Sequence, residues 1–209
     1  PNPPIGSADM LYDADTISKF ADCGISILDS PTDVIPQALV YLGYDDSSKD
    51  PDELQEAEDL LHEARPYIKK FTSSTLLNDL ANGDVCIAMS WAGDYATASA
   101  RAREAGKDID LRYFVPEEGG LLWVDIIVIP KDAKNLENAY LLLDYLLRPE
   151  VSADFVNLTH YASPVPDAKP FIKEEVLNDT AVYPTPEIMD RLFFTEVDPP
   201  KYTRIKTRI

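Results

Sequence analysis

Short apolar segments alternate with capped helical segments along most of this chain. Apolar runs of strand length occur at 25–28, 85–91, 109–116 and 121–130, and helical patterns separate most of them. Strands that alternate with helices form largely parallel sheets that are buried on both faces. The sequence therefore predicts an α/β fold, and 209 residues with 45% hydrophobic content suffice for one good core or two small ones.

Residue types that favour helix ends mark out the helical segments. The sequence Ser-Pro-Thr-Asp at 30–33 is typical of an N-cap, a first helical proline and a first-turn acid, and it predicts a helix to about Leu42. Further helices are expected at 13–24, 50–66, 73–84, 92–106 and 135–149, followed by short proline-separated helices after Pro164.

The charge of the chain is strongly negative. A formal net charge of −18 at pH 7 arises from 37 acidic and 19 basic residues, and the acids occur along the whole sequence. This surplus disfavours a nucleic-acid partner, because phosphates and carboxylates repel each other. A solvated acidic surface explains most of the charge, and a cationic partner is compatible with it.

Neither a membrane span nor a metal site is indicated. No run approaches the ~20 apolar residues that cross a bilayer. The first ten residues lack the parts of a signal peptide, and their three early prolines suggest the interior of a longer chain. His62 and His160 lie in unrelated segments without a CxxC pair, and the acidic loop 45–53 has proline where a calcium loop has glycine. We therefore expect no metal and no cofactor.

Asp125 stands within the apolar run 121–130, where a buried strand is predicted. An ionised carboxylate removed from water is costly unless a cation or hydrogen-bond donors meet it. Because residues two apart share one face of a strand, Trp123 and Asp125 should lie side by side. Trp91 and Asp94 form a similar pair at a strand-to-helix junction, and the two small residues between them leave room for another group.

An aromatic face beside a carboxylate suits an alkylammonium group. The ring contributes ~0.5–2 kcal/mol of cation–π attraction, and the carboxylate roughly 4 kcal/mol of Coulomb energy at ~4 Å before desolvation. Two such pairs suit a ligand with two ammonium groups. Each pair also has a structural interpretation that competes with ligand binding: Asp94 would cap a helix, and Asp125 would accept hydrogen bonds from backbone amides. A glycosidase could also use two carboxylates, but neither acid has an evident reason for a raised pKa.

Four stretches of the sequence carry a family resemblance: 26–45, 71–94, 117–151 and 198–208. The most specific part combines "LANGD" and "WAGD" with a later "EGG" and "DAKN". Together they resemble the periplasmic putrescine-binding proteins that feed polyamine ABC transporters. The resemblance implies a type II periplasmic binding protein fold, a small polyamine as ligand, a membrane permease as partner and no enzymatic activity. A related binder of a different small cationic ligand is the nearest alternative.

The resemblance also implies the residues of the ligand site. Trp91 and Asp94 match the pair that holds one ammonium group and stacks on the alkyl chain. Trp123 matches an aromatic wall, and Asp125 a buried aspartate that meets a cation. Three further positions match residues in or near the cleft: Tyr161, Ser73 and Asp33. At Asp33 the family has a glutamate.

Cys23 and Cys86 are the only cysteines. Their number fits one disulfide in an exported protein and equally two buried thiols in a cytosolic protein. In the resemblance the two positions match the family's disulfide pair. That implies an oxidising compartment, the periplasm.

The resemblance covers the later part of such a protein and implies a division into lobes. Residues 1–106 and 162–209 would form the second lobe. Residues 107–161 would form the C-terminal part of the first lobe with the crossing segments, without the N-terminal portion of that lobe. The apolar residues 121–129 and 139–147 would then need a cover. We expect them to be buried against another copy of the chain or a separately present N-terminal piece.

Overall fold

The computed structural model describes residues 2–197 and 199–206, so residues 1, 198 and 207–209, which belong to the expected second lobe, lie outside it. Its strands are β1 (Ile25–Ile27), β2 (Lys70–Phe71), β3 (Ile87–Ala88), β4 (Gly120–Leu121) and β5 (Leu192–Phe193). Its α-helices are α1 (Asp9–Tyr12), α2 (Ala14–Ile17), α3 (Pro31–Tyr41), α4 (Pro51–Ala64), α5 (Leu76–Asn82), α6 (Asp94–Glu104), α7 (Leu136–Leu146), α8 (Pro149–Thr159), α9 (Glu174–Leu177), α10 (Pro186–Met189) and α11 (Pro200–Lys206). The 3₁₀ helices are η1 (Ser18–Cys23), η2 (Arg65–Tyr67) and η3 (Pro166–Phe171).

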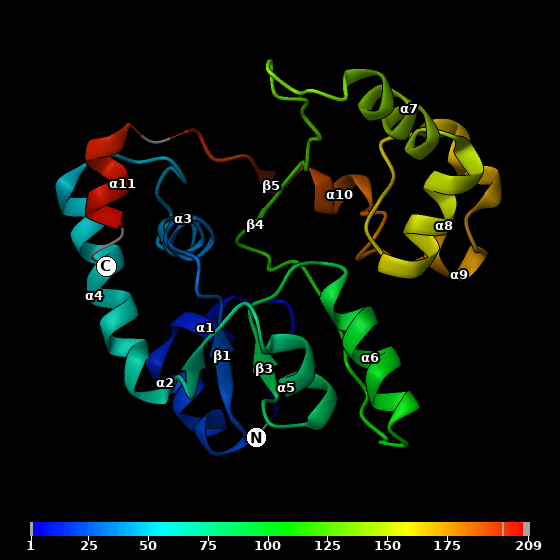
Figure 1. Cartoon of the computed structure of the whole chain (residues 1–209). Coiled ribbons are helices and arrows are strands. Elements are labelled where there is room, and N and C mark those ends of the chain that lie inside the picture. Colours follow the sequence, from blue (N-terminus) through cyan, green and yellow to red (C-terminus); the bar gives the residue numbers. More distant parts are fainter. Residues whose placement is uncertain (1, 198, 207–209) are drawn as a thin grey trace.

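β1 is the centre of a parallel sheet with the order β2-β1-β3. Ser26 of β1 is aligned with Lys70 of β2 and with Ala88 of β3. Every residue of β1 is buried, as expected for a strand that is covered on both faces. The predicted α/β class and the strands expected at 25–28 and 85–91 are therefore confirmed (Figure 1).

Two hydrophobic cores surround this sheet. One joins β1 and β3 to α2, α5 and α6, with Ile17, Ile27 and Leu76 among its buried members. The other lies between α1, α3 and α4, around Tyr12 and Leu39. Apart from α1, the helices of these two cores fall within predicted helical segments, and α3 and α4 both begin with the proline that the sequence indicated.

A disulfide fixes one end of the sheet. Cys23 at the end of η1 is bonded to Cys86, which precedes β3, and their Cα atoms are 5.6 Å apart. Gly24 makes this approach possible, since a Cβ atom at that position would lie only 2.8 Å from the carbonyl oxygen of Asp84. The predicted disulfide is confirmed.

A third core lies apart from the sheet. Ala153 and Val156 of α8 pack with Ala168 of η3 and Val176 of α9. The sequence did not predict α8, because Pro149 was interpreted only as the end of the preceding helix, whereas it also occupies the first position of a new one. The shared core joins residues on both sides of the expected lobe boundary at 161/162, and that boundary stays a prediction.

The strands expected at 109–116 and 121–130 are the main error of the sequence analysis. Residues 109–116 have no strand, and Leu121 is the only residue of the second run that lies in a strand, as the last residue of β4, which pairs in parallel with β5. The amide of Leu122 donates to the carbonyl of Phe193, and the ladder ends there. A strand requires a neighbouring strand for its backbone groups, and the described part of the chain supplies none beyond this point.

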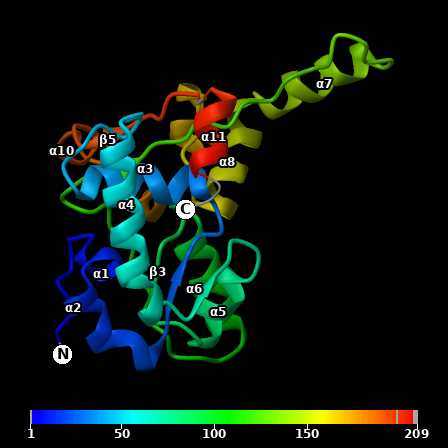
Figure 2. The same ribbon diagram turned by 90° about the vertical axis from the view of Figure 1, so that its left-hand side faces the viewer.

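The segment from the residues after β4 to residue 147, called the projecting segment below, extends away from the rest of the structure. Figure 2 shows α7 and the segment before it extending away from the other elements. Ile126 is 78% exposed, and α7 has no buried residue. The expectation that a partner covers residues 121–129 and 139–147 stays a prediction. No helix in the described ranges has both the length and the apolar character that a bilayer crossing requires.

Candidate functional site

Four of the seven predicted site residues follow strands of the parallel sheet. Asp33 follows β1, Ser73 follows β2, and Trp91 and Asp94 follow β3. The carboxyl ends of parallel strands meet at one edge of a sheet, and α/β proteins commonly bind ligands outside that edge. The topology therefore explains how residues that are distant in the sequence reach one place.

Asp33 is the hub of this site. It lies in the first turn of α3 and is 5% exposed. Its Oδ1 atom accepts hydrogen bonds from the indole Nε1 of Trp91 at 3.2 Å and from the indole Nε1 of Trp123 at 2.8 Å. The hydroxyl of Ser30 donates to its other oxygen, Oδ2. The two predicted tryptophans are thus brought together by one carboxylate, a contact that the sequence analysis did not predict.

Asp94 forms a second centre at the start of α6. Its Oδ2 atom accepts from the backbone amide of Trp91 at 3.2 Å, and the hydroxyl of Tyr161 donates to Oδ1 at 3.5 Å. Burial raises the pKa of Asp94, while these two hydrogen bonds oppose that rise. Burial, followed by the charge of Asp94, raises the pKa of Tyr161.

Gly93 decides how closely Tyr161 approaches Asp94. A Cβ atom on Gly93 would lie 2.4 Å from the carbonyl oxygen of Thr159 and 2.4 Å from the Cε2 atom of the Tyr161 ring. The room that the sequence indicated between Trp91 and Asp94 is therefore filled by the protein itself. Any side chain at position 93 would displace α8 or the tyrosine.

Tyr113 is a site neighbour that the sequence analysis missed. Burial and the nearby Asp94 charge raise the pKa of Tyr113 to about 12. Its ring stacks on Tyr95 with centroids 5.9 Å apart, and the hydroxyl of Tyr95 donates to Asp179. In the sequence, the only indication of this aromatic cluster is that Tyr95, the partner of Tyr113, directly follows Asp94.

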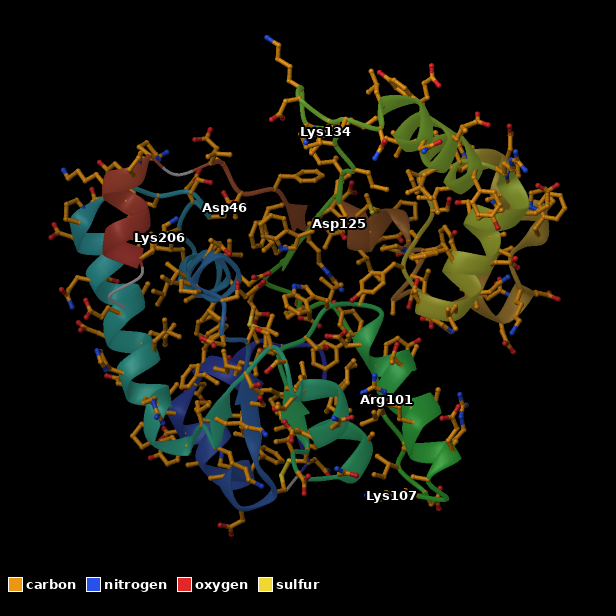
Figure 3. All side chains as sticks on the ribbon, viewed as in Figure 1. Asp46, Arg101, Lys107, Asp125, Lys134 and Lys206 are labelled. Carbon is orange, nitrogen blue, oxygen red and sulfur yellow. A yellow bond between two sulfur atoms is a disulfide. The ribbon has the colours of Figure 1, made fainter. Side chains whose placement is uncertain are left out.

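Asp125 differs from the buried aspartate that was predicted. It is exposed, and within residues 2–197 and 199–206 it takes part in no hydrogen bond or ion pair. Figure 3 shows it on the segment that leads from β4 toward Lys134. The prediction of burial is wrong because the strand that would have carried Asp125 lacks a neighbour.

Ser73 is half-buried, and its Oγ atom is shielded from solvent without a hydrogen-bond partner in the described structure. The residues around it are already paired, since Thr75 donates to Asp79 at 2.8 Å and Lys70 forms an ion pair with Asp79. A shielded hydroxyl without a partner is uncommon. Ser73 therefore has a free group to offer, although the structure gives it no contact with Asp33 or Asp94.

The site contains no constellation for a bound metal. No group of three or more histidine, cysteine, aspartate or glutamate side chains with the geometry to hold a metal ion occurs among the described residues. No lysine or arginine whose side chain the structure describes forms an ion pair with Asp33, Asp94 or Asp125. The chemistry of the site is thus that of aromatic rings and carboxylates.

Comparison with known proteins gives one family and a consistent set of relatives. The model of the bacterial extracellular solute-binding protein family matches residues 6–184. The putrescine-binding periplasmic protein SpuD of Pseudomonas aeruginosa (strain UCBPP-PA14) is 38% identical over 207 residues, which are 99% of this chain and 56% of SpuD. The putrescine-binding periplasmic protein PotF of Escherichia coli (strain K12) is 40% identical over 208 residues, or 99% and 56% of the two chains. The chain thus spans little more than half the length of these relatives.

Solved structures agree with the fold. The spermidine/putrescine ABC transporter substrate-binding protein PotD from Streptococcus pneumoniae superposes with a TM-score of 0.75 at 31% identity and covers 89% of this chain and 56% of its own. The Tp0655 (TpPotD) lipoprotein of Treponema pallidum superposes with a TM-score of 0.71 at 25% identity over 91% of this chain and 59% of its own. The predicted periplasmic binding protein fold of type II is confirmed.

Proposed function

This chain belongs to the bacterial extracellular solute-binding proteins, and we propose that its site captures a putrescine-like diamine. One observation carries the proposal. Asp94 accepts hydrogen bonds from the backbone amide of Trp91 and the hydroxyl of Tyr161, Asp125 follows Trp123 by two positions, and neither carboxylate has a cationic partner among the side chains that the structure describes. A diamine supplies two cations joined by an apolar chain, which is the complement of such a site.

Each residue has a role that follows from its chemistry. Asp94 accepts one ammonium group, and Trp91 and Tyr161 form the wall around it. Trp123 packs along the alkyl chain, and Asp125 accepts the second ammonium group once a cover excludes water from the projecting segment that carries it. The shielded hydroxyl of Ser73 offers a further polar contact. Asp33 completes the set at the N–H edges of the two indole rings.

The relatives support the class of ligand and the setting. SpuD and PotF are named putrescine-binding periplasmic proteins, and the PotD structure is named a substrate-binding protein of an ABC transporter. By analogy the chain acts in the periplasm and delivers its ligand to a membrane permease. These relatives are transport components and not enzymes, and they lend no support to a carboxylate-pair hydrolase.

The remaining wall of the site is proposed to come from a further polypeptide. The relatives are almost twice as long as this chain, and the apolar residues 121–129 and 139–147 offer a surface for the additional part. The N-terminal portion of a first lobe, or a second copy of the chain, would cover that surface. Without the cover, binding should be weak because water reaches the carboxylates.

Isothermal titration calorimetry with putrescine, spermidine, glucose and glutamate tests the ligand class. Asp94→Asn and Asp125→Asn should each weaken putrescine binding by ~2–5 kcal/mol, since a bound ammonium group loses its counter-charge. Asp132→Asn is the matched control, because Asp132 is exposed on the same segment as Asp125 and loses the same charge. The titrations are made on the 209-residue chain and on the chain with an N-terminal region supplied. The solution mass of each sample is measured as well. Preferential binding of glucose or glutamate would overturn the proposal.

A further inference from the structure

Asp33 holds three donors from three separate parts of the chain. Ser30 lies just before α3, Trp91 lies 58 positions beyond Asp33, and Trp123 lies 90 positions beyond it. Both indole N–H groups converge on a single oxygen atom, Oδ1. The two rings are also the only tryptophans of the chain. A single carboxylate therefore fixes the orientation of both.

Little capacity is left on this carboxylate for a ligand. An ionised carboxylate offers about four lone-pair positions, and the two indoles and the Ser30 hydroxyl occupy three of them. The side chain is 5% exposed, so that an ammonium group would have to displace an indole to reach it. Asp33 is therefore poorly suited to meet the ligand directly.

The negative charge of Asp33 is stabilised from within the fold. It lies in the first turn of the 11-residue helix α3, whose unpaired N–H groups and dipole favour an anion. The charge has hydrogen-bond donors and no lysine or arginine partner among the side chains that the structure describes. The full charge thus acts on the two indole N–H bonds.

An indole that donates its N–H to an anion is polarised. Hydrogen bonds in a low-dielectric site polarise the groups that they join, and in this direction they increase the electron density of the ring. A more electron-rich ring attracts a cation more strongly over its face. Asp33 can therefore strengthen cation binding at both tryptophans without touching the cation.

We infer that Asp33 is a shared positioning residue, which orients Trp91 and Trp123 and polarises both rings toward a bound diamine. This inference rests on the proposed function for its ligand, and it assigns Asp33 a role through the tryptophans in place of a direct ammonium contact. The burial of Asp33 fits this role, since the residue acts through the two rings.

The first test needs no ligand. Tryptophan fluorescence and the long-wavelength tryptophan bands of the near-ultraviolet circular dichroism spectrum report on Trp91 and Trp123, since the chain has no other tryptophan. Asp33→Ala should shift the emission and reduce the near-ultraviolet signal. Asp33→Asn keeps an acceptor oxygen and should stay close to the parent spectrum. Ser30→Ala is the matched control, because it removes the third donor and leaves both indole contacts in place. Far-ultraviolet circular dichroism confirms folding. Unchanged indole spectra in folded Asp33→Ala would overturn the inference.

The second test is a double-mutant cycle with putrescine. Asp33→Ala should lower the affinity about tenfold or more, and Asp33→Asn by a smaller factor, because the former loses orientation and charge and the latter only charge. In a background with Trp91→Phe and Trp123→Phe, which lacks both indole N–H groups, Asp33→Ala should have no further effect. An equal loss in both backgrounds would mean that Asp33 contacts the ligand and would overturn the inference. Absence of any diamine binding by the parent protein would instead count against the proposed function, and the spectra would still decide the role of Asp33.

Discussion

The sheet region, residues 25–102, and the projecting segment, residues 122–147, are both rich in apolar side chains but differ in what covers them. Ile27 in the sheet region is 1% exposed, whereas Ile126 in the projecting segment is 78% exposed. β1 has a neighbouring strand on each side, while the run after β4 keeps a neighbour only as far as Leu122. Apolar content thus predicts that a segment needs a cover, and the neighbours decide whether it becomes a strand.

The largest expected effect concerns the disulfide of the sheet region. Replacing Cys23 and Cys86 with alanine should lower the free energy of unfolding by about 4 kcal/mol, because the bond closes a loop of 63 positions in the unfolded chain. Urea unfolding followed by circular dichroism measures the change. Reduction of the parent protein is the control and should give a similar loss.

Hydrogen exchange separates the two regions in the same experiment. Amides of β1 and β3 should lose protection when the disulfide is removed, whereas amides of the projecting segment should exchange rapidly in both proteins. A uniform change over both regions would mean that they unfold as one unit. In that case the contrast between them would be wrong.

A matched pair of isoleucine truncations probes the cores directly. Ile27→Ala should cost about 3 kcal/mol of stability, because it leaves a cavity in a closed core. Ile126→Ala should change the stability of the isolated chain by less than about 0.5 kcal/mol, because its side chain is already in water. Urea unfolding of both variants is the measurement. A large cost for Ile126→Ala would show that the projecting segment is covered in solution, and sedimentation of the same sample would identify self-association as the cause.

The sequence predicted the sheet region well for a physical reason. Caps and prolines within the segments themselves mark the ends of its helices, and β1 has both of its neighbouring strands, β2 and β3, within the described chain. Pro31 and Pro51 begin helices as predicted. The run 121–130 has an equally strong apolar pattern, but its state depends on strands that the described chain lacks. Local pattern contains no information about such a neighbour.

The candidate site shows the same limit. The tryptophan and aspartate pairs are recognisable as residues close in sequence. In the structure, the backbone amide of Trp91 donates to the carboxylate of Asp94. The structure connects Trp123 to Asp33 across 90 positions, which no local spacing could reveal. Tyr161 was placed by resemblance alone, and the structure brings it to Asp94. Long-range contacts therefore had to come from the fold.

A smaller effect is expected at Gly93, where the start of α6 meets the end of α8. Gly93→Ala should cost about 2 kcal/mol, because the new Cβ atom overlaps the carbonyl of Thr159 and the ring of Tyr161. Thermal unfolding measures the loss. Gly106→Ala is the control for the glycine-to-alanine change itself, since nothing lies within 4 Å of a Cβ atom at that position, although its positive φ of 69° adds a strain of its own. Equal stability of Gly93→Ala and the parent would show that Tyr161 does not lie against α6.

The smallest expected effect contrasts the two acids of the site at different pH. Burial raises the pKa of Asp94 in the folded chain above its ordinary value of 3.8. Such a carboxyl group stabilises the fold fully below the unfolded pKa, and this contribution is lost as the pH rises through the folded pKa. Asp94→Asn cannot ionise, so at neutral pH it should be more stable than the parent, and the difference should vanish below pH 3.8. Asp125→Asn should leave the stability unchanged at both pH values, because Asp125 is exposed and has no partner among the described residues. Urea unfolding of the three proteins at neutral and acid pH measures the contrast. An equal gain in stability for Asp125→Asn and Asp94→Asn would mean that the two carboxylates have similar surroundings. The distinction between the sheet region and the projecting segment would then be wrong.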